Sequence, residues 1–480
     1  MSGATVTLDA VTAALPSARA ARLVGDGGVG VRGMTHDSRQ VEPGMLFACV
    51  RGERHDGHRF ADRAVAAGAS ALLVDHTLDV PVPQVVVDDT RLAMGPAAAR
   101  AYGDPSSALL IVGITGTNGK TTTTHLLASI LRASGRRTGV IGTLSGGHTT
   151  PEAPELQARL AEFRDDGDTA VVMEVSSHAL ALHRVDGTRF SAAVFTNLGT
   201  DHLDLHLTVE EYFRAKASLF APALSAVGVT NLDDAHGRLL FDAAPIEMVG
   251  YSLADADDVE IGVAAHAFTW RGERLQVGLG GAFNVMNTLA AATTAASLGI
   301  DVATIAAGLA DVEAVPGRFE RVDTVTGAAR ARGIDVIVDY AHTPDGLEQL
   351  IAAARRVDPD GRVLLVFGCG GDRDHAKRPQ MGSVAVRLAD WVAVTSDNPR
   401  SEPPLAIIDD VLHGMLPAER ANVVIEPDRR SAIGLALQAA RAGDLVLVAG
   451  KGHETTQTIG DEVVEFDDRA VVRQLLERDS

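Results

Sequence analysis

Thr115-Gly116-Thr117-Asn118-Gly119-Lys120-Thr121-Thr122 follows an apolar run, residues 108–114, that predicts a strand, and it precedes a predicted helix from His125 to Arg132. In that setting the glycines let successive backbone N–H groups point inward, Lys120 adds a mobile cation, and Thr121 offers a hydroxyl for Mg²⁺. The stretch therefore predicts a phosphate loop for a nucleoside triphosphate, made by Gly116, Thr117, Asn118, Gly119, Lys120, Thr121 and Thr122. Ile114 stands where the general loop pattern has glycine, so this is a short form of the loop.

The composition limits the class of protein. The chain has 480 residues, which at roughly 150 residues per domain predicts about three domains. Its net charge of −20 and its aromatic content of 4% argue against a nucleic-acid partner. No run of about 18 apolar residues occurs, so we expect no membrane insertion and a soluble, cytoplasmic protein. Cys49 and Cys369 are too few for a disulfide framework, and we interpret them as buried or loop thiols.

The order of predicted elements indicates an α/β protein of three domains. Residues 1–90 read as a small α/β unit, and residues 91–315 as a nucleotide-binding unit with a parallel sheet around the phosphate loop. In residues 316–480, single helices separate the predicted strands, which indicates a Rossmann-like, doubly wound parallel sheet. Those strands are 335–338, 362–367, 391–395, 422–425 and 444–448.

Two further segments place polar groups after predicted strands of the second unit. Glu174 ends a strand that runs into Ser176, Ser177 and His178, where it could hold Mg²⁺; a strand-end Glu followed by a capping Ser explains the pattern equally well. The segment 196–206 carries several Asn, Asp and His side chains after the next strand. It contains no Cys, so oxygen ligation of Mg²⁺ is favoured over Zn²⁺.

The ordered motifs of the whole chain resemble those of the Mur ligase family. They are THDSR at 35–39, TGTNGKTT at 115–122, EVSSHAL at 174–180, FTNLGTDHLDLH at 195–206, YFRAKASLF at 212–220, GAFNVMN at 281–287, PGRFE at 316–320, DYAHTP at 339–344, GCGGDRDHAKRP at 368–379, SDNPR at 396–400 and GKGHE at 450–454. The resemblance is closest to members that add meso-diaminopimelate to UDP-N-acetylmuramoyl-L-alanyl-D-glutamate. It implies an ATP- and Mg²⁺-dependent amide ligase of peptidoglycan synthesis that works through an acyl phosphate.

The resemblance also implies roles for individual residues. Lys120, Glu174, His202 and Lys216 would be catalytic; Thr121, Glu174, His202 and Lys216 would hold Mg²⁺, with Lys216 carbamylated. Further nucleotide contacts would come from Asn284, Asn287, Arg318 and Asp339. The UDP-sugar would meet Ser38, Arg39, Thr149, Thr150, Ser177 and Arg184. The amino acid would meet Arg373, Asp397, Asn398, Pro399, Arg400, Gly450 and Glu454, with the Arg400 guanidinium gripping the distal carboxylate of diaminopimelate.

Some positions depart from the family pattern, and other functions stay open. The stretch 142–151 is short, 258–278 looks trimmed, and Ala282 replaces a common basic residue. The alternatives are a ligase that adds L-lysine or another amino acid, a folylpolyglutamate synthetase, or a nucleotide-binding homologue without ligase activity. The expected partners are small molecules, namely the UDP-muramoyl dipeptide, meso-diaminopimelate and ATP, and the expected state is a monomer.

Overall fold

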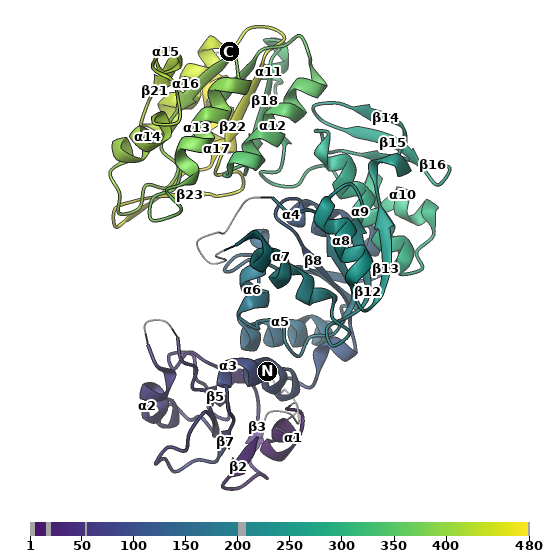
Figure 1. Ribbon diagram of the computed structural model, residues 1–480, viewed down its shortest axis with the longest axis vertical. Coiled ribbons are helices and arrows are strands. Elements are labelled where there is room, and N and C mark those ends of the chain that lie inside the picture. Colours follow the sequence, from purple (N-terminus) through teal and green to yellow (C-terminus); the bar gives the residue numbers. More distant parts are fainter. Residues whose placement is uncertain (1–4, 16–20, 53–54, 200–207, 479–480) are drawn as a thin grey trace.

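The computed structural model describes residues 5–15, 21–52, 55–199 and 208–478. Figure 1 shows three α/β units stacked along the long axis, with the first unit in purple, the second in blue to teal and the third in green to yellow. None of the helices in the described ranges is long and apolar enough to cross a membrane.

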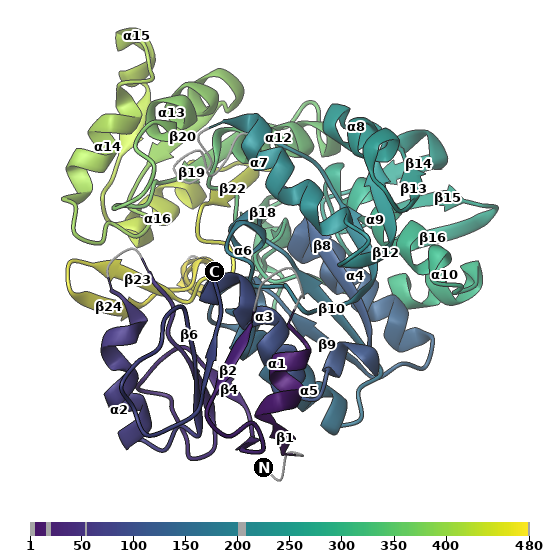
Figure 2. The same ribbon diagram turned by 60° about the horizontal axis from the view of Figure 1, so that its bottom comes forward.

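The first unit is built on a small sheet in the order β2-β7-β6-β5-β4, in which all neighbours are parallel except β2 and β7. Its strands are β2 (Arg22–Val24), β4 (Met34–Thr35), β5 (Leu46–Ala48), β6 (Ala71–Val74) and β7 (Gln84–Val86), and β1 (Val6–Thr7) pairs with β3 (Gly30–Val31). Its helices are α1 (Leu8–Ala13), α2 (Ala61–Ala66) and α3 (Thr90–Ala101). Figure 2 brings this unit forward and shows α1 beside α3, with which it shares one core.

The second unit contains a parallel sheet in the order β13-β12-β11-β8-β10-β9. These strands are β8 (Leu110–Thr115), β9 (Thr138–Ile141), β10 (Ala170–Glu174), β11 (Phe190–Phe195), β12 (Ser225–Asn231) and β13 (Glu247–Tyr251). The helices are α4 (Lys120–Ala133), α5 (Ala153–Asp165), α6 (Ser177–Ala181), α7 (Val209–Ala217), α8 (Ala235–Ala243), α9 (Phe283–Ser297) and α10 (Val302–Ala310). The central position of β8 places the loop after it at the middle of the carboxyl edge, where parallel sheets bind ligands.

The sequence prediction was wrong about the start of one helix of this unit. Helix α4 begins at Lys120, five residues before the predicted start at His125, because Gly119 has φ +85 and lets the loop turn directly into the helix. The stretch interpreted as trimmed forms an antiparallel sheet of β14 (Asp257–Ile261), β15 (His266–Trp270) and β16 (Glu273–Val277). Its alternating residues Phe268, Trp270, Leu275 and Val277 are buried in the core that also contains α9.

The third unit confirms the predicted doubly wound sheet. The order is β17-β18-β22-β19-β20-β21, parallel except for β17. The strands are β17 (Glu320–Arg321), β18 (Asp335–Asp339), β19 (Val363–Phe367), β20 (Trp391–Val394), β21 (Val423–Ile425) and β22 (Leu445–Ala449). One face is covered by α12 (Pro344–Val357), α13 (Lys377–Leu388) and α14 (Pro404–Leu412), and the other by α11 (Ala328–Ala331), α16 (Arg429–Ala439) and α17 (Asp468–Arg478).

A hairpin of β23 (Thr456–Ile459) and β24 (Glu462–Glu465) follows β22, and the short helix α15 (Pro417–Arg420) precedes β21. Both cysteines are buried, which confirms the first of the two alternatives, buried or loop thiols, and burial raises the pKa of each thiol to about 12.

Candidate active site

The phosphate loop lies between β8 and α4, and its glycines are required by close neighbours. A Cβ on Gly116, which has φ +148, would lie 1.9 Å from Thr196 Oγ1. A Cβ on Gly119 would lie 2.3 Å from Asn287 Oδ1. The loop is therefore pressed between the end of β11 and helix α9, and no other residue type fits either position without movement of these elements.

Two lysines converge on one carbonyl of this loop. Lys120 Nζ donates to Gly116 O and to Thr117 O, both at 2.9 Å, and Lys216 Nζ donates to Gly116 O at 2.8 Å. Lys216 is only 1% exposed and its ammonium lies 4.3 Å from the centre of the Tyr212 ring. The structure thus brings together two of the four predicted catalytic residues at the start of the loop.

A buried oxygen cluster lies at the first turn of α4. Thr121 Oγ1 donates to Glu174 Oε2 at 3.1 Å, and Thr143 donates to the same carboxylate through its N–H at 2.8 Å and its hydroxyl at 3.2 Å. Glu174 is 2% exposed. A carboxylate and hydroxyl oxygens are hard donors of the kind that Mg²⁺ prefers, so these groups fit the predicted ion. Ser176 also caps α6, accepting from Ala179 N at 3.1 Å, which confirms the capping serine. The role of Glu174 toward Mg²⁺ stays a prediction.

The segment after β11 braces the phosphate loop. Asn118 N donates to Asn197 Oδ1 at 2.9 Å, and Thr196 Oγ1 donates to Asn118 O at 2.6 Å. Thr117 Oγ1 lies 3.1 Å from the Tyr212 hydroxyl, on the helix that carries Lys216. The predicted metal ligand His202 lies outside the described residues. The hydrogen bonds of Thr196 and Asn197 show a second role of this motif, which is to position the backbone of the phosphate loop. The polar composition of the motif did not reveal that role.

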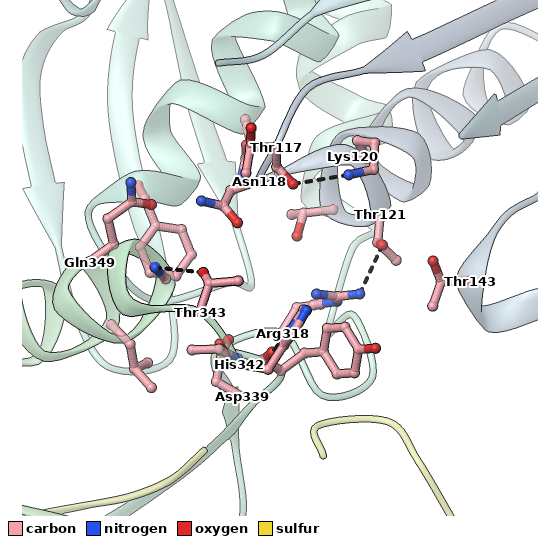
Figure 3. A pocket seen from close by; sticks show the side chains of 18 of the residues that line it. Thr117, Asn118, Lys120, Thr121, Thr143, Arg318, Asp339, His342, Thr343 and Gln349 are labelled. Atoms are coloured by element: carbon pink, nitrogen blue, oxygen red, sulfur yellow. Dashed lines mark hydrogen bonds between the residues drawn. The ribbon is translucent and has the colours of Figure 1, made fainter. Parts of the chain in front are cut away.

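Residues of the third unit complete the nucleotide cavity, as Figure 3 shows. Arg318 Nη2 donates to Thr121 Oγ1 at 3.0 Å, and its guanidinium lies 4.5 Å from the centre of the Tyr340 ring. The cavity has a volume of about 240 Å³ and is lined by the phosphate loop on one side and by residues 339–343 on the other. A nucleotide in this cavity would therefore touch both units.

Asp339 lines the same cavity, but its carboxylate already accepts two backbone hydrogen bonds. Phe319 N donates at 2.6 Å and Ala341 N at 2.8 Å. Burial raises the pKa of Asp339 above its ordinary value, while Arg318 and these N–H groups oppose the shift. Phe319 has φ +48, a conformation that side chains rarely adopt. Asp339 thus holds the turn that presents Arg318 to the phosphate loop.

The two predicted asparagines of α9 occupy different positions. Asn287 lines the cavity, whereas Asn284 is fully buried. Asn287 Nδ2 donates to Asn284 Oδ1 at 2.8 Å, and Asn284 Nδ2 donates to Gly280 O at 2.7 Å. Asn284 therefore acts on the cavity through Asn287.

The residues predicted for the UDP-sugar lie on the first two units, and Arg184 Nη1 donates to Thr150 O at 3.2 Å. Arg39 is exposed and pairs with Asp37 at 2.8 Å, and this hydrogen-bonded pair lowers the pKa of Asp37 to about 2. Arg184 Nε lies 2.9 Å from Glu152 Oε1, and Arg91 Nη1 lies 2.7 Å from Glu152 Oε2. Glu152 therefore links α3 to the segment after α6. Sequence analysis did not single out this residue.

The other four residues predicted for the UDP-sugar are two threonines that form hydrogen bonds near Glu174 and two serines that differ in burial. Thr150 Oγ1 donates to Glu174 O at 3.0 Å and accepts from Ser176 N at 3.0 Å, so it fixes the end of β10. Thr149 Oγ1 lies 3.0 Å from the Thr143 hydroxyl beside the oxygen cluster. Ser177 is buried with an unpartnered hydroxyl, and Ser38 is half-buried near Arg39.

The residues predicted for the amino acid gather at the carboxyl edge of the third sheet. Asn398 Nδ2 donates to Asp397 Oδ1 at 2.9 Å and to Glu454 Oε2 at 2.8 Å. A Cβ on Gly450 would lie 2.6 Å from Asp397 Oδ2, so that position must stay without a side chain. Lys451 is fully buried, and its Nζ lies 2.9 Å from Glu454 Oε2 and donates to Thr456 O at 2.6 Å. Asn398 thus bridges the carboxylates of Asp397 and Glu454, and the buried Lys451 is the cation that contacts Glu454.

Arg400 lies beside this acidic group, on a strained backbone. It has φ +53, and its N–H donates to Thr458 O at 3.0 Å. Its Nη1 donates to Gly371 O at 2.7 Å, so the guanidinium lies against the loop that carries Arg373, which is itself exposed. Pro399 is buried. The structure therefore places the segments 371–373, 397–400, 450–454 and β23 together.

A buried ion pair that sequence analysis missed supports this arrangement. Arg429 and Asp468 are both fully buried and their charged atoms lie 2.7 Å apart. Arg429 also donates to Ser396 O at 3.3 Å, in the first residue of the SDNPR motif, and to Ala449 O at 2.9 Å, in the residue before the GKGHE motif. Removal of one partner from such a pair is strongly destabilising. An arginine at the start of α16 carries no signal of this role in the sequence.

The described chain matches three family profiles in order. Residues 30–102 match "Mur ligase family, catalytic domain", residues 114–295 match "Mur ligase middle domain", and residues 317–452 match "Mur ligase, glutamate ligase domain".

Curated and solved relatives cover nearly the whole chain. It is 46% identical over 482 residues to the UDP-N-acetylmuramoyl-L-alanyl-D-glutamate–2,6-diaminopimelate ligase of Streptomyces coelicolor, covering 94% of each chain. It is 44% identical to the protein of that name from Syntrophomonas wolfei, covering 93% of this chain and 94% of the relative. A solved structure of a ligase with the same name is 33% identical, with a TM-score of 0.68 and 99% of each chain covered.

Proposed function

The chain belongs to the Mur ligase family, and from that premise we propose that it joins meso-diaminopimelate to the D-glutamyl carboxylate of UDP-N-acetylmuramoyl-L-alanyl-D-glutamate with cleavage of ATP. The relatives that share 44 to 46% of its residues carry the name of this activity. The product is a precursor of peptidoglycan.

One observation carries the proposal. The carboxyl edge of the third sheet holds both the residues that close the nucleotide cavity, after β18, and the predicted amino-acid site, after β19, β20 and β22. A ligase must bring an activated carboxyl group and an amine together, and a single edge that faces both ligands provides that proximity. Arg318, which contacts Thr121 across the units, is the direct link.

The phosphoryl-transfer step is assigned to the central unit. Lys120 would leave its two carbonyl partners to bind the β- and γ-phosphates, and the backbone N–H groups of the loop would hold the rest. Thr121 and Glu174 would hold Mg²⁺, which neutralises phosphate charge when bound. The D-glutamyl carboxylate would receive the γ-phosphoryl group, and the amine would then displace phosphate from the acyl phosphate.

Lys216 is proposed to work as a carbamate. Its ammonium is buried beside Gly116 O and the Lys120 side chain. Carbamylation would replace this cation by an anion, relieve the repulsion between the two lysines, and supply a carboxylate-like oxygen for a second Mg²⁺. His202 would be the other protein ligand of that ion.

The two ends of the amino acid are proposed to bind to groups of opposite charge in this site. The acidic group of Asp397 and Glu454, with Asn398, would bind the ammonium end of the amino acid. Arg400, supported by Arg373, would bind the distal carboxylate, which diaminopimelate has and lysine lacks. The UDP-sugar would lie between the first two units against Ser38, Arg39, Thr149, Thr150, Ser177 and Arg184.

We also propose the domain bounds 1–90, 91–315 and 316–480, a cytoplasmic location and a monomeric state. A lysine-adding specificity is the second candidate within the family, because Lys and diaminopimelate share their reacting end.

The experiment is a direct assay of the joined product. Purified protein is incubated with ATP, Mg²⁺ and the UDP-muramoyl dipeptide, and each amine is offered in turn. We expect ADP release that depends on diaminopimelate and a product heavier by that residue. ADP release without any joined product, or a product with lysine alone, would overturn the proposal.

A further inference from the structure

A histidine and aspartate cluster lies in the first unit, away from the site described above. His58 belongs to the short 3₁₀ helix Gly57–Phe60, and Asp75 and His76 directly follow β6. His58 Nε2 lies 3.2 Å from Asp75 Oδ1, and His76 Nδ1 contacts the same oxygen. The ligand atoms of the three residues all lie within 4.8 Å of one another. Three side chains with metal-binding atoms therefore face one point.

The orientation of His58 is fixed by a fourth residue. His58 Nδ1 lies 2.6 Å from Asp56 Oδ1, which also accepts from the His58 backbone N–H at 3.0 Å. A carboxylate at this nitrogen keeps the proton on Nδ1 and leaves the lone pair on Nε2. Asp75 N donates to Nε2 at 3.3 Å, in agreement with that tautomer. A carboxylate behind the ring is the usual partner of a metal-binding histidine.

The resulting geometry suits a cation. With the His58 proton on Nδ1, no proton separates Nε2 from the carboxylate oxygen of Asp75 at 3.2 Å, and the lone pair of Nε2 accepts a long contact from Asp75 N at 3.3 Å. The rings of His58 and His76 stack with centroids 4.6 Å apart, so the two imidazoles lie close enough to face one ion.

Arg51 is the cation that neighbours the cluster. Its Nε lies 2.7 Å from Asp75 Oδ2 and 4.0 Å from Asp56 Oδ2, and its Nη2 donates to Asp75 Oδ1 at 3.3 Å. The Arg51 side chain is 63% exposed, so an ion on Oδ1 would replace its longer contact while the contact to Oδ2 stays. A cavity of about 770 Å³ opens on Asp75 and His76 and provides access for an ion and its water ligand.

We propose that His58 Nε2, Asp75 Oδ1 and His76 Nδ1 bind a divalent ion of the zinc class, with water in the fourth position. Two imidazole nitrogens and one carboxylate oxygen suit Zn²⁺, Co²⁺ or Ni²⁺ and are a poor set for Mg²⁺. The ion ties the 3₁₀ helix to the end of β6. Its binding therefore stabilises the first unit, and the site is independent of the ligase reaction.

The test is a Co²⁺ titration of the metal-free full-length protein in excess Mg²⁺, followed by visible absorption. We expect one ion with tetrahedral absorption bands in the wild type, and a rise in the unfolding temperature on addition of Zn²⁺. His76→Ala, at a half-exposed side chain, should lose both signals. Asp56→Asn should bind Co²⁺ about 10- to 100-fold more weakly, because it removes the group that orients His58.

His413→Ala, at an exposed histidine after α14, is the matched control and should bind as the wild type does. The proposal is wrong if the wild type shows no tetrahedral bands, or if His76→Ala binds Co²⁺ with unchanged affinity and spectrum. The second result would place the ion at another site of the chain.

Discussion

The phosphate loop and the proposed amino-acid site are built in different ways. The loop comes from eight consecutive residues, 115–122, and the groups proposed to bind phosphate are its backbone N–H donors and one lysine. The amino-acid site combines 371–373, 397–400, 450–454 and β23, which are held by side-chain contacts such as those of Lys451 and Arg429. A binding loop made of backbone groups is encoded by consecutive residues. A pocket made of side chains depends on contacts with residues that are distant in the sequence.

Mutations in the two regions should act differently. A change in the loop should remove chemistry and leave the fold, because Lys120 donates to carbonyls of its own loop. A change in the supports of the amino-acid site should weaken binding of one substrate and leave the use of ATP intact.

The largest expected effect is that of Lys120→Ala. We expect a loss of roughly 10³-fold or more in kcat, because the lysine acts on charge that develops during phosphoryl transfer. The unfolding temperature should stay close to that of the wild type. Phosphate release and thermal unfolding measure the two quantities, and wild-type phosphate release would contradict the assignment of the loop.

Lys216→Ala should lose about 10²- to 10³-fold in kcat, since it removes the group proposed to carry the carbamate. Short carboxylates added to the assay should restore part of the activity by standing in for that anion. The matched variant is Lys216→Arg, which keeps the cation and cannot form the carbamate. If Lys216→Arg retains wild-type activity, the carbamate role is wrong.

A smaller and more selective effect is expected from Lys451→Met, which breaks the amino-acid site. Glu454 loses its buried ammonium partner, so kcat/KM for diaminopimelate should fall by roughly 10- to 100-fold. The KM for ATP should not change. Arg430→Met, at a half-buried residue of the same unit that contacts Gln474, is the control. An equal rise in both KM values would show that Lys451 supports the whole unit instead of this site.

His453 gives the smallest expected effect, at the contact between the two regions. Burial is the largest cause that lowers the pKa of His453 from 6.5 to about 4. The nearby cations Arg318, Arg469 and Lys451 lower it further. The unfolded chain therefore binds one more proton between these values, and stability is lost as the pH falls from about 6.5 to 4. Histidine NMR titration should find this low pKa, and Arg318→Ala should raise it. A wild-type pKa near 6.5 would contradict the packing of His453 against Arg318.

The sequence predicted much of the loop and the doubly wound sheet because both depend on local patterns. The apolar runs at 108–114 and 362–367 fall on β8 and β19, and the glycines of the loop are required where they stand. The start of α4 was missed because the run of threonines after Lys120 has low helix propensity, and the loop overrides it.

Supports between distant residues were not predictable from a single chain. Arg429 and Asp468 are 39 positions apart and look like ordinary helix-end charges until the fold buries them together. Lys451 lies inside the GKGHE motif, in which Gly450 and Glu454 were the predicted site residues. Its burial was not visible from the sequence. Glu152 and the bracing role of Asn197 are further examples, because their partners come from other elements.

The most direct measurement compares kcat/KM for meso-diaminopimelate and lysine in the wild type and in Arg400→Ala. A charge-assisted bidentate contact in a half-buried pocket is worth on the order of 2–4 kcal/mol, or roughly 30- to 1,000-fold. We predict a loss of that size for diaminopimelate and a much smaller change for lysine, which lacks the distal carboxylate. An equal loss for both amines would contradict the account and show that Arg400 supports the loop at Gly371 rather than reading the substrate.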